Sequence, residues 1–99
     1  MIRVRETPSF RRHAKRLRPN QKADLNRAIR DLAERPLVGE RKSGDLSWVR
    51  VWKCRLVGQL SLLAYEYRAD DGIIILHAIG SHENFYRDLK TAARQSEAE

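Results

Sequence analysis

The chain has 99 residues and a formal net charge of +7 at pH 7, with 41% hydrophobic and 33% charged residues. This length suits one domain with a single core, and the composition excludes an intrinsically disordered chain. No apolar run approaches the roughly 20 residues of a membrane span, and the first ten residues lack the apolar segment of a signal peptide. The lone Cys54 excludes an intramolecular disulfide. We therefore expect a cytoplasmic protein.

The first third of the chain predicts an edge strand followed by a basic helical hairpin. Residues 2–6 alternate apolar and charged side chains, which is typical of a half-buried strand. Thr7 and Pro8 then mark a helix start, with Thr7 as the N-cap. The chain breaks at Pro19 before a second, longer helix, which ends ahead of Pro36. The apolar residues of the two helices recur at helical spacing: Phe10, Ala14, Leu17, Leu25, Ile29 and Leu32.

Three further strands are predicted after a loop at residues 36–47, which is rich in turn formers. They span Trp48–Leu56, Gln59–Tyr67 and Ile73–Ile79, and the last is apolar throughout, as in a central strand covered on both faces. The order predicts an α+β fold: an N-terminal strand, a two-helix hairpin, then a three-stranded antiparallel meander. We expect a twisted sheet of about four strands with the helices on one face, the other face open, and a short C-terminal segment at its rim.

One domain is expected over residues 1–90, with a frayed tail at residues 91–99. The positive charge lies in its first half. Residues 1–42 carry 13 Lys and Arg against 5 Asp and Glu, whereas residues 43–99 carry 7 against 8. This asymmetry favours a polyanion such as nucleic acid, or an acidic protein partner, over an ordinary solvated helix surface. The candidate RNA-contacting residues are Arg11, Arg12, Lys15, Arg16, Arg50 and Arg87.

The candidate catalytic residues lie on the first strand of the meander and just after the last. Strand alternation places Lys53 and Arg55 on one face, about 7 Å apart, where cations stabilise the charge that builds on a phosphorane. The alternative is an ordinary solvent-facing side of a sheet. His82 follows the predicted central strand, and imidazole suits proton transfer near neutral pH. The alternative for His82 is a loop histidine that bonds only its neighbours.

Two aromatic residues follow His82. We assign Phe85 to packing and Tyr86 to the site, because an aromatic ring beside a cationic groove can stack on an unpaired base. Of the other histidines, we expect His77 to be packed within its strand and His13 to lie on the surface of the basic helix. No zinc-type ligand spacing, phosphate-cradling glycine loop or Ser/Cys triad signature is present, so no metal or cofactor is expected.

From Ile2 to Leu89, the order of elements and three local segments resemble the RelE/ParE superfamily of bacterial toxin–antitoxin toxins. The segments are VWKCRL, LSLLAYEY with IIILHAIGSH, and GSHENFY. The last resembles the C-terminal active-site segment of ribosome-dependent mRNA interferases. YafQ-like members carry a histidine at the position of His82 and an aromatic residue near Tyr86. They also use further histidines and an acidic residue where Lys53 and Gln59 stand here, and RelE-like members carry an arginine near His82.

The resemblance implies a type II toxin that cleaves mRNA in the ribosomal A site through the substrate's own 2′-OH. His82 would be the general acid or base, Lys53 and Arg55 would contact the phosphate, Tyr86 would orient the substrate, and the basic helices would hold ribosomal RNA. The implied partners are an acidic antitoxin, for which residues 2–6 offer a strand edge, the ribosome and mRNA. Two alternatives remain open: a ParE-type inhibitor of DNA gyrase, and a non-catalytic RNA- or ribosome-binding module.

Overall fold

The computed structural model describes residues 2–81, 85–87, 89 and 90, and the predicted frayed tail at 91–99 lies outside this range. The α+β class and the order of the elements are as predicted. The elements in chain order are β1 (Arg3–Glu6), α1 (Pro8–Lys15), α2 (Pro19–Glu34), β2 (Glu40–Arg41), a 3-10 turn (Gly44–Leu46), β3 (Arg50–Leu56), β4 (Gln59–Arg68) and β5 (Ile73–Gly80). After β5, Ser81 has no regular secondary structure, and residues 85–87, 89 and 90 are helical.

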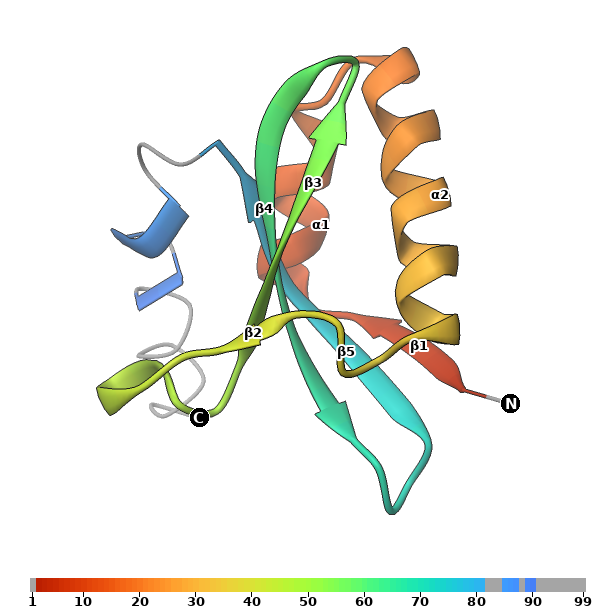
Figure 1. Cartoon of the computed structure of the whole chain (residues 1–99). Helices are drawn as coiled ribbons and strands as arrows, with labels where there is room; N and C mark the ends of the chain where they lie inside the picture. Colours follow the sequence, from red (N-terminus) through yellow and green to blue (C-terminus); the bar gives the residue numbers. More distant parts are fainter. Residues whose placement is uncertain (1, 82–84, 88, 91–99) are drawn as a thin grey trace.

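The sheet has five strands in the order β1-β5-β4-β3-β2, rather than the expected four (Figure 1). Strands β2 to β5 are antiparallel neighbours, and β1 pairs with β5 in parallel. The additional strand is β2, which lies within the predicted loop and pairs Glu40 with Val51. Two residues are too few to show the alternation that signals a strand, so its pairing is decided by the position of β3.

Strand β1 is an edge strand, as predicted, but it is not half-buried. All four of its residues are exposed, and only Ile2, just before it, packs against the core. An edge strand has a neighbour on one side only, and β1 pairs with just the first half of β5, from Ile73 to Leu76. Its alternating pattern therefore predicted a strand correctly and predicted its burial wrongly.

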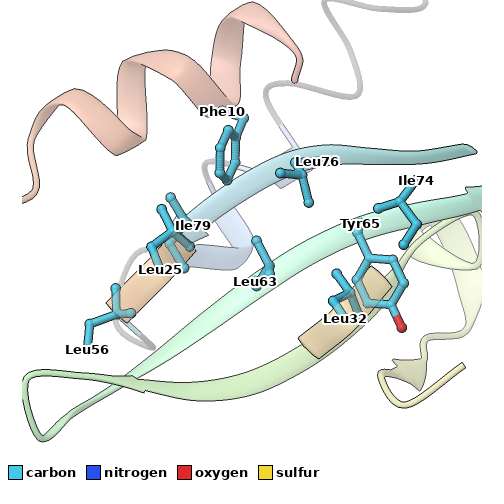
Figure 2. Close-up of a cluster of buried hydrophobic side chains, with 9 residues drawn as sticks. All are labelled: Phe10, Leu25, Leu32, Leu56, Leu63, Tyr65, Ile74, Leu76 and Ile79. Carbon is cyan, nitrogen blue, oxygen red and sulfur yellow. The ribbon is translucent and has the colours of Figure 1, made fainter. Parts of the chain in front are cut away.

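The helical hairpin packs against one face of the sheet and forms the main core there. Helix α1 begins as predicted, with Thr7 as the N-cap and Pro8 in the first turn, and α2 ends before Pro36. In Figure 2, Phe10 reaches from α1 toward Leu76, and α2 contributes Leu25 and Leu32. The buried residues of this cluster are Phe10, Leu25, Leu32, Leu56, Leu63, Tyr65, Ile74, Leu76 and Ile79. Within the described residues, no helix combines the length and apolar character needed to cross a membrane.

The other face of the sheet is partly covered, which corrects the expectation of an open face. A second cluster lies there, because strand alternation turns Val51, Leu62 and Ala64 away from the helices. Phe85 and Leu89, which are 2% and 0% exposed, pack against it from the C-terminal helical residues. Figure 1 shows these residues, in blue, on the side of the sheet opposite α2. The assignment of Phe85 to packing is therefore confirmed.

Candidate nucleic-acid interface

Lys53 and Arg55 lie exposed on β3, on the face of the sheet that points away from the helices. Their neighbours Trp52 and Cys54 pack toward the helical core, so the predicted alternation is confirmed. Lys53 forms no ion pair with any of the described residues. Arg55 donates from Nη1 to the carbonyl of Gly58 at 3.0 Å, which holds its guanidinium near the β3–β4 turn. Two cations therefore point into solvent from one strand.

The sheet register connects these cations to the end of β5. Lys53 pairs with Leu62, and Leu62 pairs with Gly80. Two interstrand spacings separate Lys53 from Gly80, which is about 10 Å between Cα atoms. A Cβ at Gly80 would meet no atom of the described residues within 4 Å. His82 follows two residues later and lies outside the described residues.

Tyr86 contacts Phe85 and Lys42, and Lys42 lies two residues before the 3-10 turn. The Tyr86 ring is edge-on to Phe85, with centroids 5.2 Å apart, and Lys42 Nζ lies 5.7 Å from its centroid. The Lys42 amide donates to the carbonyl of Val49, which precedes Lys53 by four residues, or about 13 Å along the strand.

Lys42 is a candidate that the sequence analysis missed. Its signal was a basic pair, Arg41 and Lys42, within a segment read as a loop. Only the pairing of β2 with β3 shows that this segment belongs to the sheet.

The cations of α1 form an exposed stripe, as predicted. Arg11 is partly neutralised, because its Nε lies 3.8 Å from a carboxylate oxygen of Glu6. Arg12, Lys15 and Arg16 are exposed and form no ion pair within the part of the chain that the structure describes. Cations near a helix C-terminus are also favoured by the helix dipole.

The other two predicted contacts differ from each other. Arg50 is half-buried and donates from Nη1 to the carbonyl of Gly39 at 3.0 Å, so its guanidinium is engaged in holding the loop before β2. Arg87 is exposed on the C-terminal helical residues. The structure thus places Lys53 and Arg55 on one face of β3, the cations of the first helix on a separate element, and the Arg50 guanidinium against the loop before β2.

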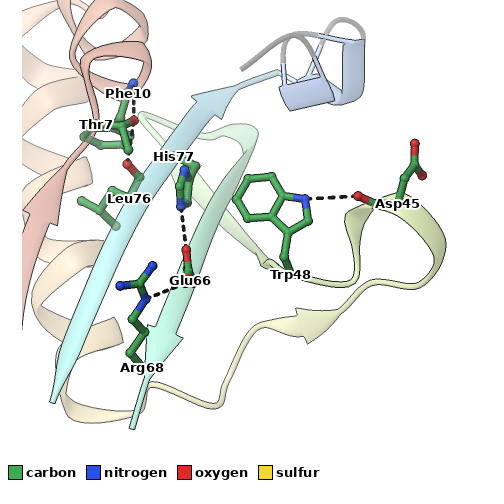
Figure 3. A network of polar contacts seen from close by, with 8 residues as sticks. All are labelled: Thr7, Phe10, Asp45, Trp48, Glu66, Arg68, Leu76 and His77. Atoms are coloured by element: carbon green, nitrogen blue, oxygen red, sulfur yellow. Dashed lines mark hydrogen bonds and ion pairs between the residues drawn. The ribbon is translucent and has the colours of Figure 1, made fainter. Parts of the chain in front are cut away.

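A polar cluster lies on the face away from the helices. A β-bulge makes His77 the extra residue of β5, because Ala64 pairs with Ala78 and Tyr65 with Leu76. Figure 3 shows His77 between Trp48 and Glu66. The Trp48 ring meets the imidazole edge-on at 4.7 Å, and Nε2 of His77 lies 3.3 Å from the Glu66 carboxylate. Burial lowers the pKa of His77, and the Glu66 hydrogen bond opposes this shift. His77 is therefore packed within its strand, as expected.

Two further kinds of group could serve a site of this kind: the Cys54 thiol and clusters of metal-binding side chains among the described residues. Burial raises the pKa of the Cys54 thiol to about 11, so the thiolate is scarce at neutral pH. Among the described residues, no three His, Cys, Asp or Glu side chains gather closely enough to hold a metal ion.

His13 is not simply a surface residue, which corrects the expectation for it. It is partly buried, because it lies on the flank of α1 beside Ala14 and Leu17, which pack against the core. It lines a pocket of about 180 Å³ together with Arg16, Leu17, Ile79, Gly80, Ser81 and Phe85. The helical spacing marked the basic stripe correctly, but it could not show that the end of β5 lies beside His13.

The chain is thus a small α+β protein, with a helical hairpin packed on a five-stranded mixed sheet and exposed basic residues on the other face. The chain belongs to the ParE-like toxin family of type II bacterial toxin–antitoxin systems, which it matches over residues 4–90. The resemblance to the RelE/ParE superfamily is thereby confirmed, and the chain is a toxin of a type II system. No significant match is found among curated proteins.

Solved structures share the fold at low sequence identity. A chain of the RelBE2 toxin–antitoxin complex from Mycobacterium tuberculosis is 22% identical, with a TM-score of 0.72 over 82% of this chain and 98% of that one. A mutant of Escherichia coli RelE in the free state is 13% identical, with a TM-score of 0.72 over 96% of each chain. The same E. coli toxin in complex with a peptide of its antitoxin RelB is 15% identical, with a TM-score of 0.65 over 99% and 94%.

Proposed function

We propose that this toxin is a ribosome-dependent endoribonuclease that acts in the cytoplasm and inhibits translation by cleaving mRNA. The observation that carries the proposal is the exposure of Lys53 and Arg55 on one face of β3, with Lys53 in the row that leads through Leu62 to Gly80. The GSHENFY segment begins at Gly80 and carries His82 two residues later. This arrangement offers phosphate-binding cations and a proton-transfer group to one region of a bound RNA.

The proposed reaction uses the 2′-OH of the RNA as the nucleophile. Two protons must move, one off the 2′-OH and one onto the leaving 5′-oxygen, and His82 performs one of these transfers. Lys53 and Arg55 stabilise the negative charge that develops on the phosphorus oxygens. Tyr86, with Lys42 beside its ring, stacks on or orients the substrate. Arg12, Lys15 and Arg16 of α1 hold ribosomal RNA through its phosphates.

The proposed protein partner is an acidic antitoxin. Matched structures include RelE-type toxins bound to their antitoxins, and this chain carries a net charge of +7. Its β1 is an exposed edge strand with unpaired backbone groups along its outer side. An antitoxin that adds a strand here, or that covers the cationic face of β3, would bury the charge on which RNA binding depends.

A second candidate function is inhibition of DNA gyrase. The observation that favours it is the family match itself, which is to ParE-like toxins. An inhibitor of this kind needs no acid–base residue, so Lys53 and Arg55 would serve as contacts to protein or DNA. It predicts DNA double-strand breaks with intact mRNA.

The experiment that tests the proposal is inducible expression in bacteria, with mRNA 5′ ends mapped and DNA breaks scored in the same cultures. The wild type is expected to arrest growth and produce new 5′ ends within translated codons. Lys53→Ala removes a preorganised cation and is expected to lower cleavage about a hundredfold. His82→Ala is expected to lower it by a similar or larger factor. Lys22→Ala, an exposed cation on α2, serves as the matched control and should cleave normally.

The same experiment separates the alternatives. DNA breaks with intact mRNA would replace the nuclease with the gyrase inhibitor. Growth without either kind of damage, together with salt-sensitive RNA binding in vitro, would leave a non-catalytic RNA-binding module. Undiminished mRNA cleavage by both Lys53→Ala and His82→Ala would remove these residues from the mechanism.

A further inference from the structure

The pocket that His13 lines lies where the C-terminal end of α1 meets the end of β5. Strand β1 pairs with β5 only as far as Leu76, and α1, which follows β1 directly, is in contact with β5. Thr7 fixes the start of α1 at this point, because both its backbone amide and its hydroxyl donate to the Leu76 carbonyl, each at 3.1 Å. Gly80 contributes no side chain, and no atom of the described residues lies within 4 Å of where its Cβ would be.

The lining combines an apolar surface with a few polar groups. Leu17, Ile79 and Phe85 supply the apolar part, and Arg16, His13 and Ser81 supply hydrogen-bonding groups. Arg16 is exposed and forms no ion pair with the described residues, so its guanidinium donors are available to a ligand. A bare phosphate suits such a lining poorly, because apolar walls cannot replace the water around an anion.

The volume of the pocket is suited to a ligand with one six-membered ring. A cavity of about 150 Å³ in another protein accommodates benzene, and this pocket measures about 180 Å³. It therefore has room for one six-membered ring with small polar substituents. A pyrimidine has this form: a flat apolar body whose edge carries carbonyl acceptors that arginine, histidine and serine can satisfy.

The location connects the pocket to the proposed cleavage site. Gly80 both lines the pocket and ends the row that begins at Lys53, about 10 Å away. At 3.4 Å per nucleotide in a stacked strand, this distance covers at most about three nucleotides. A base held in the pocket would therefore belong to the same short stretch of RNA as the phosphate at Lys53.

We propose that this pocket binds one unpaired pyrimidine base of the RNA substrate, with Arg16 and His13 at its polar edge. The inference rests on the proposed nuclease function and extends it to substrate selection. The pyrimidine would be pulled out of the stack next to the scissile bond, so cleavage would depend on the base at one position of the codon.

The test is a titration of the ¹⁵N-labelled full-length protein with uridine 5′-monophosphate, followed by NMR. The amide signals of His13, Gly80 and Ser81 are expected to shift. Ribose 5-phosphate, which carries the same sugar and phosphate without the base, should leave them in place. Arg16→Ala and Gly80→Val are each expected to weaken binding of the mononucleotide at least about tenfold, and Lys22→Ala should bind it normally.

Gly80→Val is expected to fold, because a Cβ at this position would meet no atom of the described residues within 4 Å and β-branched residues suit strands. An unchanged melting temperature checks this. Three results would overturn the pocket: no shift with uridine monophosphate, equal shifts with ribose 5-phosphate, or undiminished binding by Gly80→Val. The titration involves neither ribosome nor cleavage. If mRNA stays intact in cells but the NMR signals shift, the nuclease function is rejected and the base-binding pocket is kept. If mRNA is cleaved but the signals do not shift, the pocket is rejected and the nuclease function is kept.

Discussion

The Tyr65 hydroxyl holds the loop between α2 and β2 from inside the core. It donates to the Pro36 carbonyl at 2.7 Å and accepts from the Gly39 amide at 2.9 Å, and the side chain is fully buried. Gly39 must lack a side chain, because a Cβ there would lie 2.6 Å from the tyrosine ring. Arg50 donates to the Gly39 carbonyl from the other side. These bonds position the short strand that leads to Lys42.

Replacing Tyr65 with phenylalanine is expected to lower the free energy of unfolding by about 1–3 kcal/mol. The substitution leaves the buried Gly39 amide and the partly buried Pro36 carbonyl without their partner, while the ring still fills its space. Urea denaturation measures the change. Tyr67→Phe is the matched control, because no hydrogen bond of the Tyr67 hydroxyl is found among the described residues, and it should change stability by less than about 0.5 kcal/mol. Equal effects of the two substitutions would contradict the role of the Tyr65 hydroxyl.

The titration of His77 is expected to make the fold less stable in mild acid. Burial lowers the pKa of His77 below its usual value of 6.5, and Arg68 adds to this, while Glu66 opposes it. The unfolded chain therefore takes up the proton first. Its contribution to stability is complete above about pH 6.5 and is lost as the pH falls from there toward the lower pKa of the folded state. His77→Gln is expected to flatten this part of the curve of urea midpoint against pH. A variant with an unchanged curve would assign the acid sensitivity to other groups.

At the scale of elements, the junction of β1 and α1 orders the part of the molecule that surrounds the pocket. Thr7 caps α1 by accepting from the Phe10 amide at 3.1 Å, and its hydroxyl also donates to the Leu76 carbonyl (Figure 3). The Thr7 side chain thus caps α1 directly after the end of β1 and joins this helix to β5 by a hydrogen bond. The register of α1 beside β5, and with it the position of His13 and Arg16, depends on this residue.

Thr7→Ala is expected to lower the free energy of unfolding by about 1–2 kcal/mol, since it removes the cap and the bond to β5 together. Thr7→Ser keeps the hydroxyl and should lose much less. Thermal denaturation of the two variants provides the comparison. If serine were as destabilising as alanine, the methyl group rather than the hydroxyl would account for the effect.

At the scale of the whole molecule, the two faces of the sheet have different roles. The helical hairpin covers one face and supplies most of the core. On the other face, Phe85 and Leu89 pack against the second cluster, and Lys53 and Arg55 are exposed. Since basic residues also line the outer side of α1, cationic surface lies on both sides of the end of β5. A bound RNA strand could therefore pass over Gly80 and contact both sets of cations.

The sequence predicted much of this arrangement from local patterns. Pro8 and Pro36 bounded the helices, the alternation in β3 predicted the faces of Lys53 and Trp52, and Phe85 was assigned correctly to the core. Other features had no local signal. Strand β2 is too short for a periodicity, the exposure of β1 depends on what lies beside it, and the surroundings of His13 come from residues more than 60 positions away.

The sequence by itself determined the order of the helices and longer strands, because helical and strand periodicities are properties of neighbouring residues. It also determined the cationic character, because net charge is a sum over the chain, and its resemblance to the RelE/ParE superfamily indicated the family. The tertiary structure decided which of the charged side chains meet. It placed Lys42 over the Tyr86 ring, engaged Arg50 in the loop before β2, and brought His13 and Arg16 to the end of β5. Contacts of this kind depend on strand order and helix packing, which join residues that no pattern in the chain connects.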